Sequence, residues 1–268
     1  MPELEIVVCI KQVIKQDYYP KVRIDPITKT LRREEYPAEM NPLDKHALEA
    51  ALQLKDEQGG RVTILSMGPP QTEETLREAL AMGADEAILL CDQAFAGADT
   101  LATSYTLAAG IRTLNQVDLI LCGNETVDSG TGQVGPQLAV LLDIPAIIYV
   151  RKIHFIEDFI IQVERTIEEG YLLMETQLPA LLAVVKEINT PRYPSLMGIA
   201  DAAKKTITYL TVKDINLNTT KVGAKGSPTE TKELFTPKLK KRQGEILKGP
   251  PDKVSRLLVH KLHERGMV

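Results

Sequence analysis

Residues 122–136 read Cys-Gly-Asn-Glu-Thr-Val-Asp-Ser-Gly-Thr-Gly-Gln-Val-Gly-Pro, and they are the most informative part of the chain. An apolar run from Val117 to Cys122 stops at this small, polar loop, and an apolar helical pattern follows the loop directly. A strand, a glycine-rich loop and a helix in that order bring backbone amides and a positively polarised helix N-terminus close to an anion. No Gly-Lys-Ser/Thr follows the glycines, so the loop is not a P-loop. It predicts a phosphate ligand without identifying the nucleotide.

The first half of the chain alternates between strand-like and helix-like patterns. Asn41-Pro42 is typical of a helix start, with Asn as the cap and Pro at the first helical position. Such alternation predicts a parallel sheet, in which ligands bind at the carboxyl ends of the strands. Strands are predicted at 5–10, 61–66, 86–91 and 118–122, and helices at 42–58, 72–82, from about 100 to 115, and through 142. The unusual loops all follow strands in this way and should form one large site: 9–11, 41, 66–68, 91–100 and 123–136.

The pattern changes after Pro145 to strands without helices between them, which predicts an antiparallel extension of the sheet. These strands are predicted at 146–153, 159–167, 171–176 and 180–186. A short helix is expected at 196–205, and a polar segment from 216 to 251 has too few apolar residues for a core. Residues 251–264 regain a helical stripe of apolar side chains, so this arm is expected to dock on a partner subunit.

The composition is that of an ordinary globular chain of 268 residues with 44% hydrophobic residues and a net charge of −4. This balance does not favour nucleic acid as a partner, and no apolar run reaches the roughly 20 residues of a membrane span. Met1-Pro2-Glu3-Leu4 leads straight into a strand without a targeting signal, and three cysteines cannot all pair. We expect a cytoplasmic protein with reduced, buried thiols.

Further motifs occur in order along the chain: Lys11-Gln12-Val13, Asn41-Pro42, 81–85 (Ala-Met-Gly-Ala-Asp), Val163-Glu164-Arg165, Glu169-Gly170, Leu178-Pro179 and Pro191-Arg192-Tyr193. Together with the glycine-rich loop they resemble the β subunit of electron transfer flavoproteins over nearly the whole chain. The resemblance implies an α/β fold: a Rossmann-like, mostly parallel sheet of the adenine-nucleotide-hydrolase type, with helices on both faces, an antiparallel extension and a C-terminal arm. It implies a nucleotide-binding domain at 1–188, a partner-recognition segment at 189–205, and an arm at 206–268 that packs on the α subunit.

Residues 97–104, Gly-Ala-Asp-Thr-Leu-Ala-Thr-Ser, are similar to the pattern of family members that bifurcate electrons. This implies FAD in this subunit and NADH as the electron donor. The acceptors would be ferredoxin and, through the FAD of the α subunit, a partner dehydrogenase of the acyl-CoA or 2-hydroxy acid type. The protein would then bind and tune the flavin as a redox subunit that is not catalytic alone. The alternative is a conventional carrier with AMP here, serving acyl-CoA dehydrogenases. The segment 14–19 departs from the conventional pattern.

The resemblance also assigns roles to individual residues. Adenine and ribose contacts would come from Cys9, Asn41 and Ser66, phosphate contacts from Asp128, Thr131, Gly132, Gln133 and Val134, and flavin-side contacts from Asp99, Thr100 and Thr103. The other cofactor-binding residues that it implies are Lys11, Met67, Gly68, Cys91, Asp92, Gly123, Asn124 and Glu125. Partner docking would use Leu196, Met197 and Ile199, with Leu196 as the anchor.

Plainer structural roles compete with several of these assignments. Asn41 serves equally well as a helix cap, Thr100 and Thr103 as an N-cap and a first-turn residue, and Asp128 as the organiser of its own turn. The exposed apolar residues after Pro194 could simply cover the sheet, although docking is favoured.

Other residues outside the loops also have alternative interpretations. Glu164 and Arg165 lie on a predicted strand and are compatible with a surface cross-strand ion pair worth roughly 0–1 kcal/mol. His260 and His263 have helical spacing but no matching Cys or acidic cluster, so no metal site is predicted. The basic run 237–242 is typical of a solvated face, or of a contact for an acidic partner.

Two other classes of protein were weighed against the flavoprotein. An ATP-using relative, such as a PP-loop pyrophosphatase or a universal-stress-type protein, needs a loop after the first strand that Cys9-Ile-Lys-Gln-Val13 does not supply. A purely structural partner with an empty site leaves the glycine-dense loops unexplained.

Overall fold

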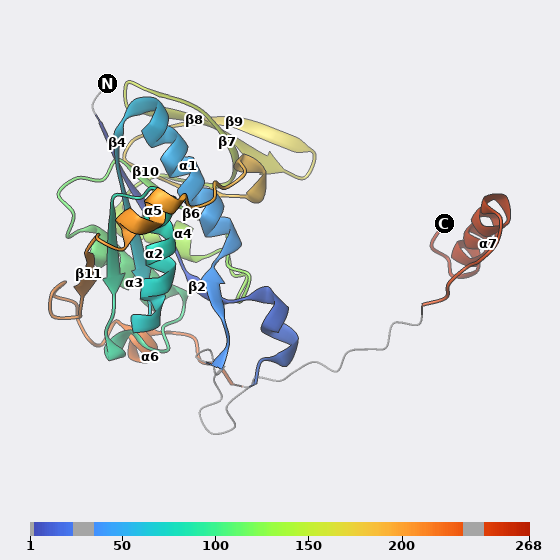
Figure 1. Cartoon of the computed structure of the whole chain (residues 1–268), viewed down its shortest axis with the longest axis horizontal. Coiled ribbons are helices and arrows are strands. Elements are labelled where there is room, and N and C mark those ends of the chain that lie inside the picture. Colours follow the sequence, from blue (N-terminus) through green and yellow to red (C-terminus); the bar gives the residue numbers. More distant parts are fainter. Residues whose placement is uncertain (1–2, 24–34, 233–243) are drawn as a thin grey trace. The chain divides into compact units, whose positions relative to one another are not determined.

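The computed structural model describes residues 3–23, 35–232 and 244–268, which fall into two units, Met1–Lys232 and Glu233–Val268. Within the described part of the first unit, nine strands form one sheet in the order β11-β5-β4-β1-β6-β10-β7-β8-β9 (Figure 1). Their bounds are Leu4–Cys9 (β1), Gly60–Met67 (β4), Glu86–Leu90 (β5), Leu119–Gly123 (β6), Ala146–Glu157 (β7), Ile160–Ile167 (β8), Gly170–Gln177 (β9), Ala180–Val184 (β10) and Ile207–Leu210 (β11).

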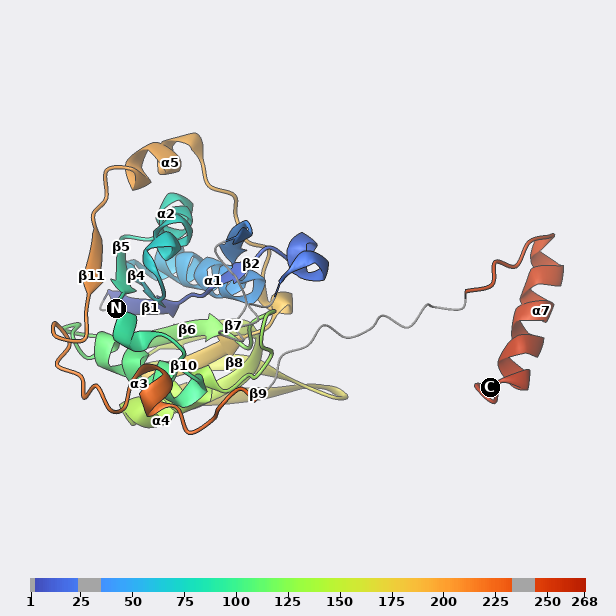
Figure 2. The same ribbon diagram turned by 90° about the horizontal axis from the view of Figure 1, so that it is seen from below.

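Helices cover both faces of this sheet. Figure 2 shows α1 (Pro42–Gln58), α2 (Glu73–Met82) and α5 (Leu196–Ala202) on one side, and α3 (Thr100–Ile111), α4 (Val134–Leu142) and α6 (Gly223–Gly226) on the other. Side chains alternate across a strand, so Ile6 and Val8 of β1 join the core beneath α1 and α2, while Val7 joins the core beneath α3 and α4. The α/β fold class expected from the sequence is confirmed.

The predicted antiparallel extension is partly wrong. β7, β8 and β9 do pair antiparallel, but β10 lies between β6 and β7 and is parallel to both. Every residue from Ala180 to Val184 is buried. A strand covered on both faces is typical of the interior of a parallel sheet, and its apolar run does not alternate. The chain therefore continues the sheet outward from β7 through the β8–β9 hairpin, and then returns to the interior of the sheet as β10.

Short strands form in two segments for which no strand is predicted from the sequence. Within the described residues of 11–39, β2 (Gln12–Ile14) pairs antiparallel with β3 (Ala38–Met40), and the 3₁₀ helix η1 (Gln16–Lys21) follows β2. β11 pairs parallel with β5, so the segment expected to begin an arm at 206 begins with an edge strand. Elements of three or four residues are too short for a periodic pattern to show them.

The second unit contains α7 (Pro251–Glu264), whose bounds match the predicted helix. Its Leu257, Leu258 and Val259 are exposed within that unit. Among the residues that the structure describes, no helix combines the length and the apolar character that crossing a membrane requires.

Truncating a side chain of β10 tests its place inside the sheet. Leu182 is 0% exposed, so Leu182→Ala should lower the free energy of unfolding by about 2–5 kcal/mol through lost burial and a cavity. Leu172 on β9 is 47% exposed, and Leu172→Ala should cost less than about 1 kcal/mol. Urea unfolding of the two variants measures the difference. Equal losses would contradict the interior position of β10.

Candidate functional site

The carboxyl ends of β1, β4, β5 and β6 lie along one edge of the sheet because these four strands are parallel neighbours in register. The loops after them therefore begin side by side, as the sequence predicted. Backbone hydrogen bonds connect them across the strands: Gly68 N donates to Leu90 O at 3.1 Å, and Asn124 N donates to Val184 O at 2.9 Å.

Asn41 fixes the glycine-rich loop to the start of α1. Its side chain is fully buried, its Nδ2 donates to Glu125 O at 3.0 Å, and its Oδ1 accepts from Val127 N at 3.1 Å. It occupies the N-cap position of α1, as predicted, but its side chain makes no capping bond to the helix. An amide carries both a donor and an acceptor, which suits it to satisfy two backbone groups of one loop.

Asp44, which sequence reasoning missed, joins the same loop to β1. Its carboxylate is 4% exposed and accepts from Lys11 N at 2.8 Å and from Gly123 N at 2.9 Å. A Cβ at Gly123 would lie 2.5 Å from Asp44 Oδ1, so this approach requires glycine. Burial raises the pKa of Asp44 to about 7, although hydrogen bonds from Asn41, Lys11 and Gly123 oppose the rise. No sequence signal marks Asp44, because acidic residues are common in first helical turns.

Lys11 and Asp128 form an ion pair across the site at 2.7 Å, and the Asp128 side chain is only 5% exposed. The Thr126 hydroxyl also donates to Asp128 Oδ1 at 2.8 Å. The turn-organising role that competed for Asp128 is therefore present, together with a long-range contact to β1. Because Lys11 offsets the negative charge of Asp128, this carboxylate can stand beside a phosphate at reduced electrostatic cost.

The loop between Asp128 and α4 has the form of a phosphate-binding site. Gly130 and Gly132 adopt φ of 57° and 61°, a left-handed conformation that favours glycine, and no heavy atom lies within 4 Å of a Cβ built at Gly130. Thr131 and Gln133 are exposed beside the first turn of α4, which begins at Val134. The first amides of a helix have no intrahelical acceptor, so the open loop and this turn fit an anionic group.

Ser66, Met67 and Gly68 lie at the end of β4 and the turn after it. The Ser66 hydroxyl is fully buried and has no hydrogen-bond partner among the described residues. A buried hydroxyl without a partner is costly, so it remains available for a ligand that reaches this strand end.

Cys9 and Cys122 occupy matching positions on β1 and β6, and both are buried free thiols. Burial raises the pKa of Cys9 to about 12 and raises that of Cys122 well above its usual value, and in both the nearby Asp44 adds to the effect. Cys91 is half-buried, and burial raises its pKa too. The expected burial is confirmed for Cys9 and Cys122 but not for Cys91, and all three thiols stay protonated at neutral pH.

Asp99 is the N-cap of α3. Its Oδ1 accepts from Leu101 N and Ala102 N, each at 3.0 Å, and its Oδ2 accepts from the Thr229 hydroxyl at 2.8 Å. Burial acts to raise the pKa of Asp99, but these hydrogen bonds outweigh it and lower the pKa. The cap expected at Thr100 is therefore displaced by one residue.

Thr100 and Asp92 connect this loop to its neighbours. Thr100 Oγ1 lies 3.3 Å from Gln133 Oε1, which brings the start of α3 against the glycine-rich loop. Thr103 lies in the first turn of α3, and its N donates to Asp99 O. Asp92 accepts from Ala94 N at 2.9 Å and from Val212 N at 3.1 Å, so both its oxygens bond within the protein.

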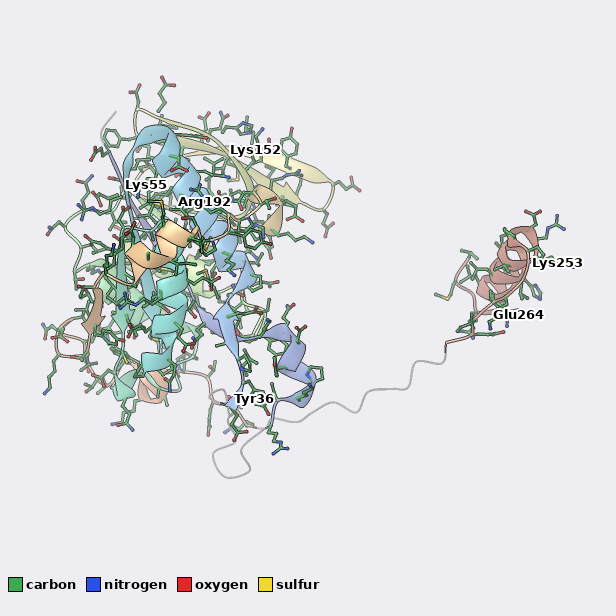
Figure 3. The ribbon with its side chains drawn as sticks, in the orientation of Figure 1. Tyr36, Lys55, Lys152, Arg192, Lys253 and Glu264 are labelled. Carbon is green, nitrogen blue, oxygen red and sulfur yellow. The ribbon has the colours of Figure 1, made fainter. Side chains whose placement is uncertain are left out.

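Three apolar side chains of the expected docking segment are exposed: Leu196 by 88%, Met197 by 78% and Ile199 by 53%. Their helix is tied down at both ends. Arg192, which lies against α1 in Figure 3, donates to the buried Glu49 from Nε at 2.9 Å, and Arg77 of α2 donates to Ala202 O at 2.8 Å. The segment thus presents apolar side chains from a fixed position.

Two further expectations concern charged residues outside the loops. Glu164 makes the expected cross-strand ion pair, with Arg151 of β7 at 3.6 Å, and it also contacts His154 at 2.9 Å. Glu164 is only 8% exposed, so the expected surface position is wrong, and Arg165 Nε is buried without a hydrogen-bond partner among the described residues. His260 instead lies 3.3 Å from Glu264 on α7. Within the described ranges, no group of three or more His, Cys, Asp or Glu side chains is arranged to hold a metal, and the basic run 237–242 lies outside those ranges.

The raised pKa of Asp44 predicts a pH-dependent stability. Its pKa is about 7 when folded against an ordinary value of 3.8, so its stabilising contribution is complete below about pH 4 and is lost as the pH rises through about 7. The stability of the wild type relative to Asp44→Asn should therefore fall by up to about 1.4 kcal/mol per pH unit in this window. Urea unfolding from pH 4 to 7 measures it, with the exposed Asp201→Asn as the control that follows the wild type. Parallel curves for wild type and Asp44→Asn would contradict the raised pKa.

Comparisons with known proteins agree with this geometry. A family model described as the electron transfer flavoprotein domain matches residues 28–215. The electron transfer flavoprotein subunit beta of Thermoanaerobacterium thermosaccharolyticum is 48% identical over 266 residues, covering 99% of this chain and 100% of the relative. The caffeyl-CoA reductase-Etf complex subunit CarD of Acetobacterium woodii is 48% identical over 267 residues, covering 99% and 100%. Protein FixA of Azotobacter vinelandii is 42% identical over 247 residues, covering 90% and 87%. The chain belongs to the electron transfer flavoprotein family, among its β subunits.

Proposed function

We propose that this chain is the β subunit of a heterodimeric, electron-bifurcating flavoprotein that binds FAD at the carboxyl edge of its sheet. It takes electrons from NADH and passes them to ferredoxin and, through the FAD of an α subunit, to a partner dehydrogenase of the acyl-CoA or 2-hydroxy acid type. The observation that carries this proposal is the open glycine-rich loop, fixed by Asn41 and Asp44 and flanked by the small residues of 97–104.

The roles of the chain's own residues follow from the geometry of the loops. The amides of residues 130–134 bind phosphate, Lys11 offsets the charge of Asp128 beside it, and Cys9 and Ser66 line the strand ends where an adenosine lies. Bound FAD supplies the redox chemistry, and the protein orients it and sets its electrostatic surroundings. Thr100 and Thr103, at the start of α3, face the flavin end.

A conventional carrier with AMP in the same place is the second candidate. It is favoured by one observation: the carboxylates of Asp92 and Asp99, assigned to the cofactor from the sequence, already accept hydrogen bonds within the protein. The glycine-rich loop would bind the phosphate of AMP equally well. The small residues at 97–104 support the larger FAD, because short side chains obstruct a bulky ligand less than long ones.

The remaining surfaces suit the partners that this function needs. We assign α7 and the arm before it to the α subunit, because α7 has exposed apolar side chains that its own unit does not cover. The segment 189–205 is assigned to the partner dehydrogenase, and the name of the relative CarD supports a CoA-linked one. The protonated thiols suit a cytoplasmic location.

Bifurcation predicts coupled electron transfer. In the heterodimer with its α subunit, NADH should reduce ferredoxin only while the acyl-CoA dehydrogenase of the same organism and an enoyl-CoA, the electron acceptor that it reduces to acyl-CoA, are present. Anaerobic spectroscopy of ferredoxin with and without that acceptor measures the coupling. Transfer to the dehydrogenase with no ferredoxin reduction under any condition would favour the conventional carrier.

Docking through α5 predicts a loss of affinity for the dehydrogenase when its exposed anchor is truncated. Leu196→Ala should raise the KM for the dehydrogenase about tenfold, as expected for an interface anchor, and leave flavin reduction by NADH unchanged. Val140→Ala on α4 removes a side chain that is 79% exposed elsewhere and serves as the control. A KM equal to that of the control would show that α5 is not the docking element.

A further inference from the structure

Residues 211–232, which we call the strap, follow β11 and end the first unit. We propose that the strap positions the loop 92–99 for the flavin end of the dinucleotide, with Thr229 and Ser227 as positioning residues that do not touch the cofactor. This inference rests on the proposed function and deepens it. The inference gives a role to the strap, whose sequence is recognisable only as a polar segment.

Hydrogen bonds connect the strap to both ends and the middle of the loop. At one end, Val212 N donates to Asp92 Oδ2 at 3.1 Å. In the middle, Ala224 N donates to Ala96 O at 2.9 Å. The other end carries three bonds, all to Asp99.

Asp99 makes these three bonds with two residues of the strap, Ser227 and Thr229. Its N donates to Ser227 Oγ at 2.8 Å, and its Oδ2 accepts from Thr229 Oγ1 at 2.8 Å and from Thr229 N at 3.1 Å. Hydrogen bonds to a carboxylate are stronger than neutral ones. Asp99 is therefore the strongest polar contact between loop and strap.

Apolar packing and a close backbone contact reinforce the polar contacts. Phe95 of the loop is buried in the same core cluster as Ile215 and Val222 of the strap. Gly223 adopts a φ of 56°, and a Cβ there would lie 2.1 Å from Ala94 O. The strap thus fits against the loop only with glycine at this position.

Asp99 connects the strap to the proposed cofactor site. One carboxylate oxygen bonds the strap, and the other caps α3 by accepting from Leu101 N and Ala102 N. The next residue, Thr100, contacts Gln133 of the glycine-rich loop. A shift of the strap would therefore move the start of α3 along the flank of the phosphate site.

The glycine-rich loop has separate anchors on the other side of the sheet. Asn41 and Asp44 of the α1 region fix it, and none of their hydrogen bonds involves the strap. AMP consists of the adenosine and one phosphate that it shares with FAD, so it would engage only this separately anchored half. Loss of the contact between the strap and the loop should therefore weaken the binding of FAD and leave the binding of AMP almost unchanged.

Thr229→Val tests this selectivity in the heterodimer after removal of its nucleotides. Loss of the hydroxyl bond to Asp99 should weaken FAD binding to this subunit roughly fivefold and change AMP binding by less than about twofold. Thr220→Val is the matched control: it removes a hydroxyl bond of 2.8 Å to Asn218, which lies in the same strap. Titrations with FAD and with AMP measure the two dissociation constants.

Gly223→Ala provides a second, steric test. It should produce the same selective loss of affinity for FAD. Gly170→Ala is the control, because it also replaces a glycine with positive φ but its Cβ would meet no atom within 4 Å. If each variant and its control had equal dissociation constants for FAD, the role of the strap would be overturned. Equal losses of affinity for FAD and for AMP would overturn it too. If the wild type binds AMP but no FAD in this subunit, the proposed bifurcating function fails and this inference fails with it.

Discussion

The buried carboxylate of Asp44 is the interaction on which the site depends. It accepts hydrogen bonds from Lys11 N at the end of β1 and from Gly123 N at the end of β6, and it belongs to the first turn of α1. Three elements that are distant in sequence therefore meet at one group. A buried charge is costly unless hydrogen-bonded, and both backbone donors here lie within 3 Å. The glycine at 123 is the matching requirement, because a side chain would occupy the space of the carboxylate.

This arrangement divides the proposed cofactor site into two halves. The phosphate half is attached to α1 through Asn41 and Asp44, and the flavin half is attached to the strap through Asp99. The docking helix α5 is anchored independently, by Arg192 and Arg77, so that partner recognition need not disturb the cofactor.

The sequence predicted the parallel half of the sheet, the convergence of the loops and the bounds of α1 and α7, because these depend on long periodic patterns and on Pro and Gly at helix ends. It failed for β10, whose buried apolar run fits either sheet arrangement, and for β11, which is too short to show a period. It missed Asp44 and the strap for a different reason. Both act through hydrogen bonds between distant residues, such as Thr229 with Asp99, and no local pattern encodes such a pairing. Asn41 was recognised, but its side chain bonds the distant loop rather than the adjacent helix.

The most direct test of the account is the nucleotide content of the heterodimer of this chain with its α subunit. Acid release followed by chromatography gives the amounts of FAD and AMP per heterodimer. The account predicts two FAD and little AMP, one FAD lying beside the glycine-rich loop of this subunit. One FAD with one AMP would contradict it and would leave a conventional electron carrier built on the same fold.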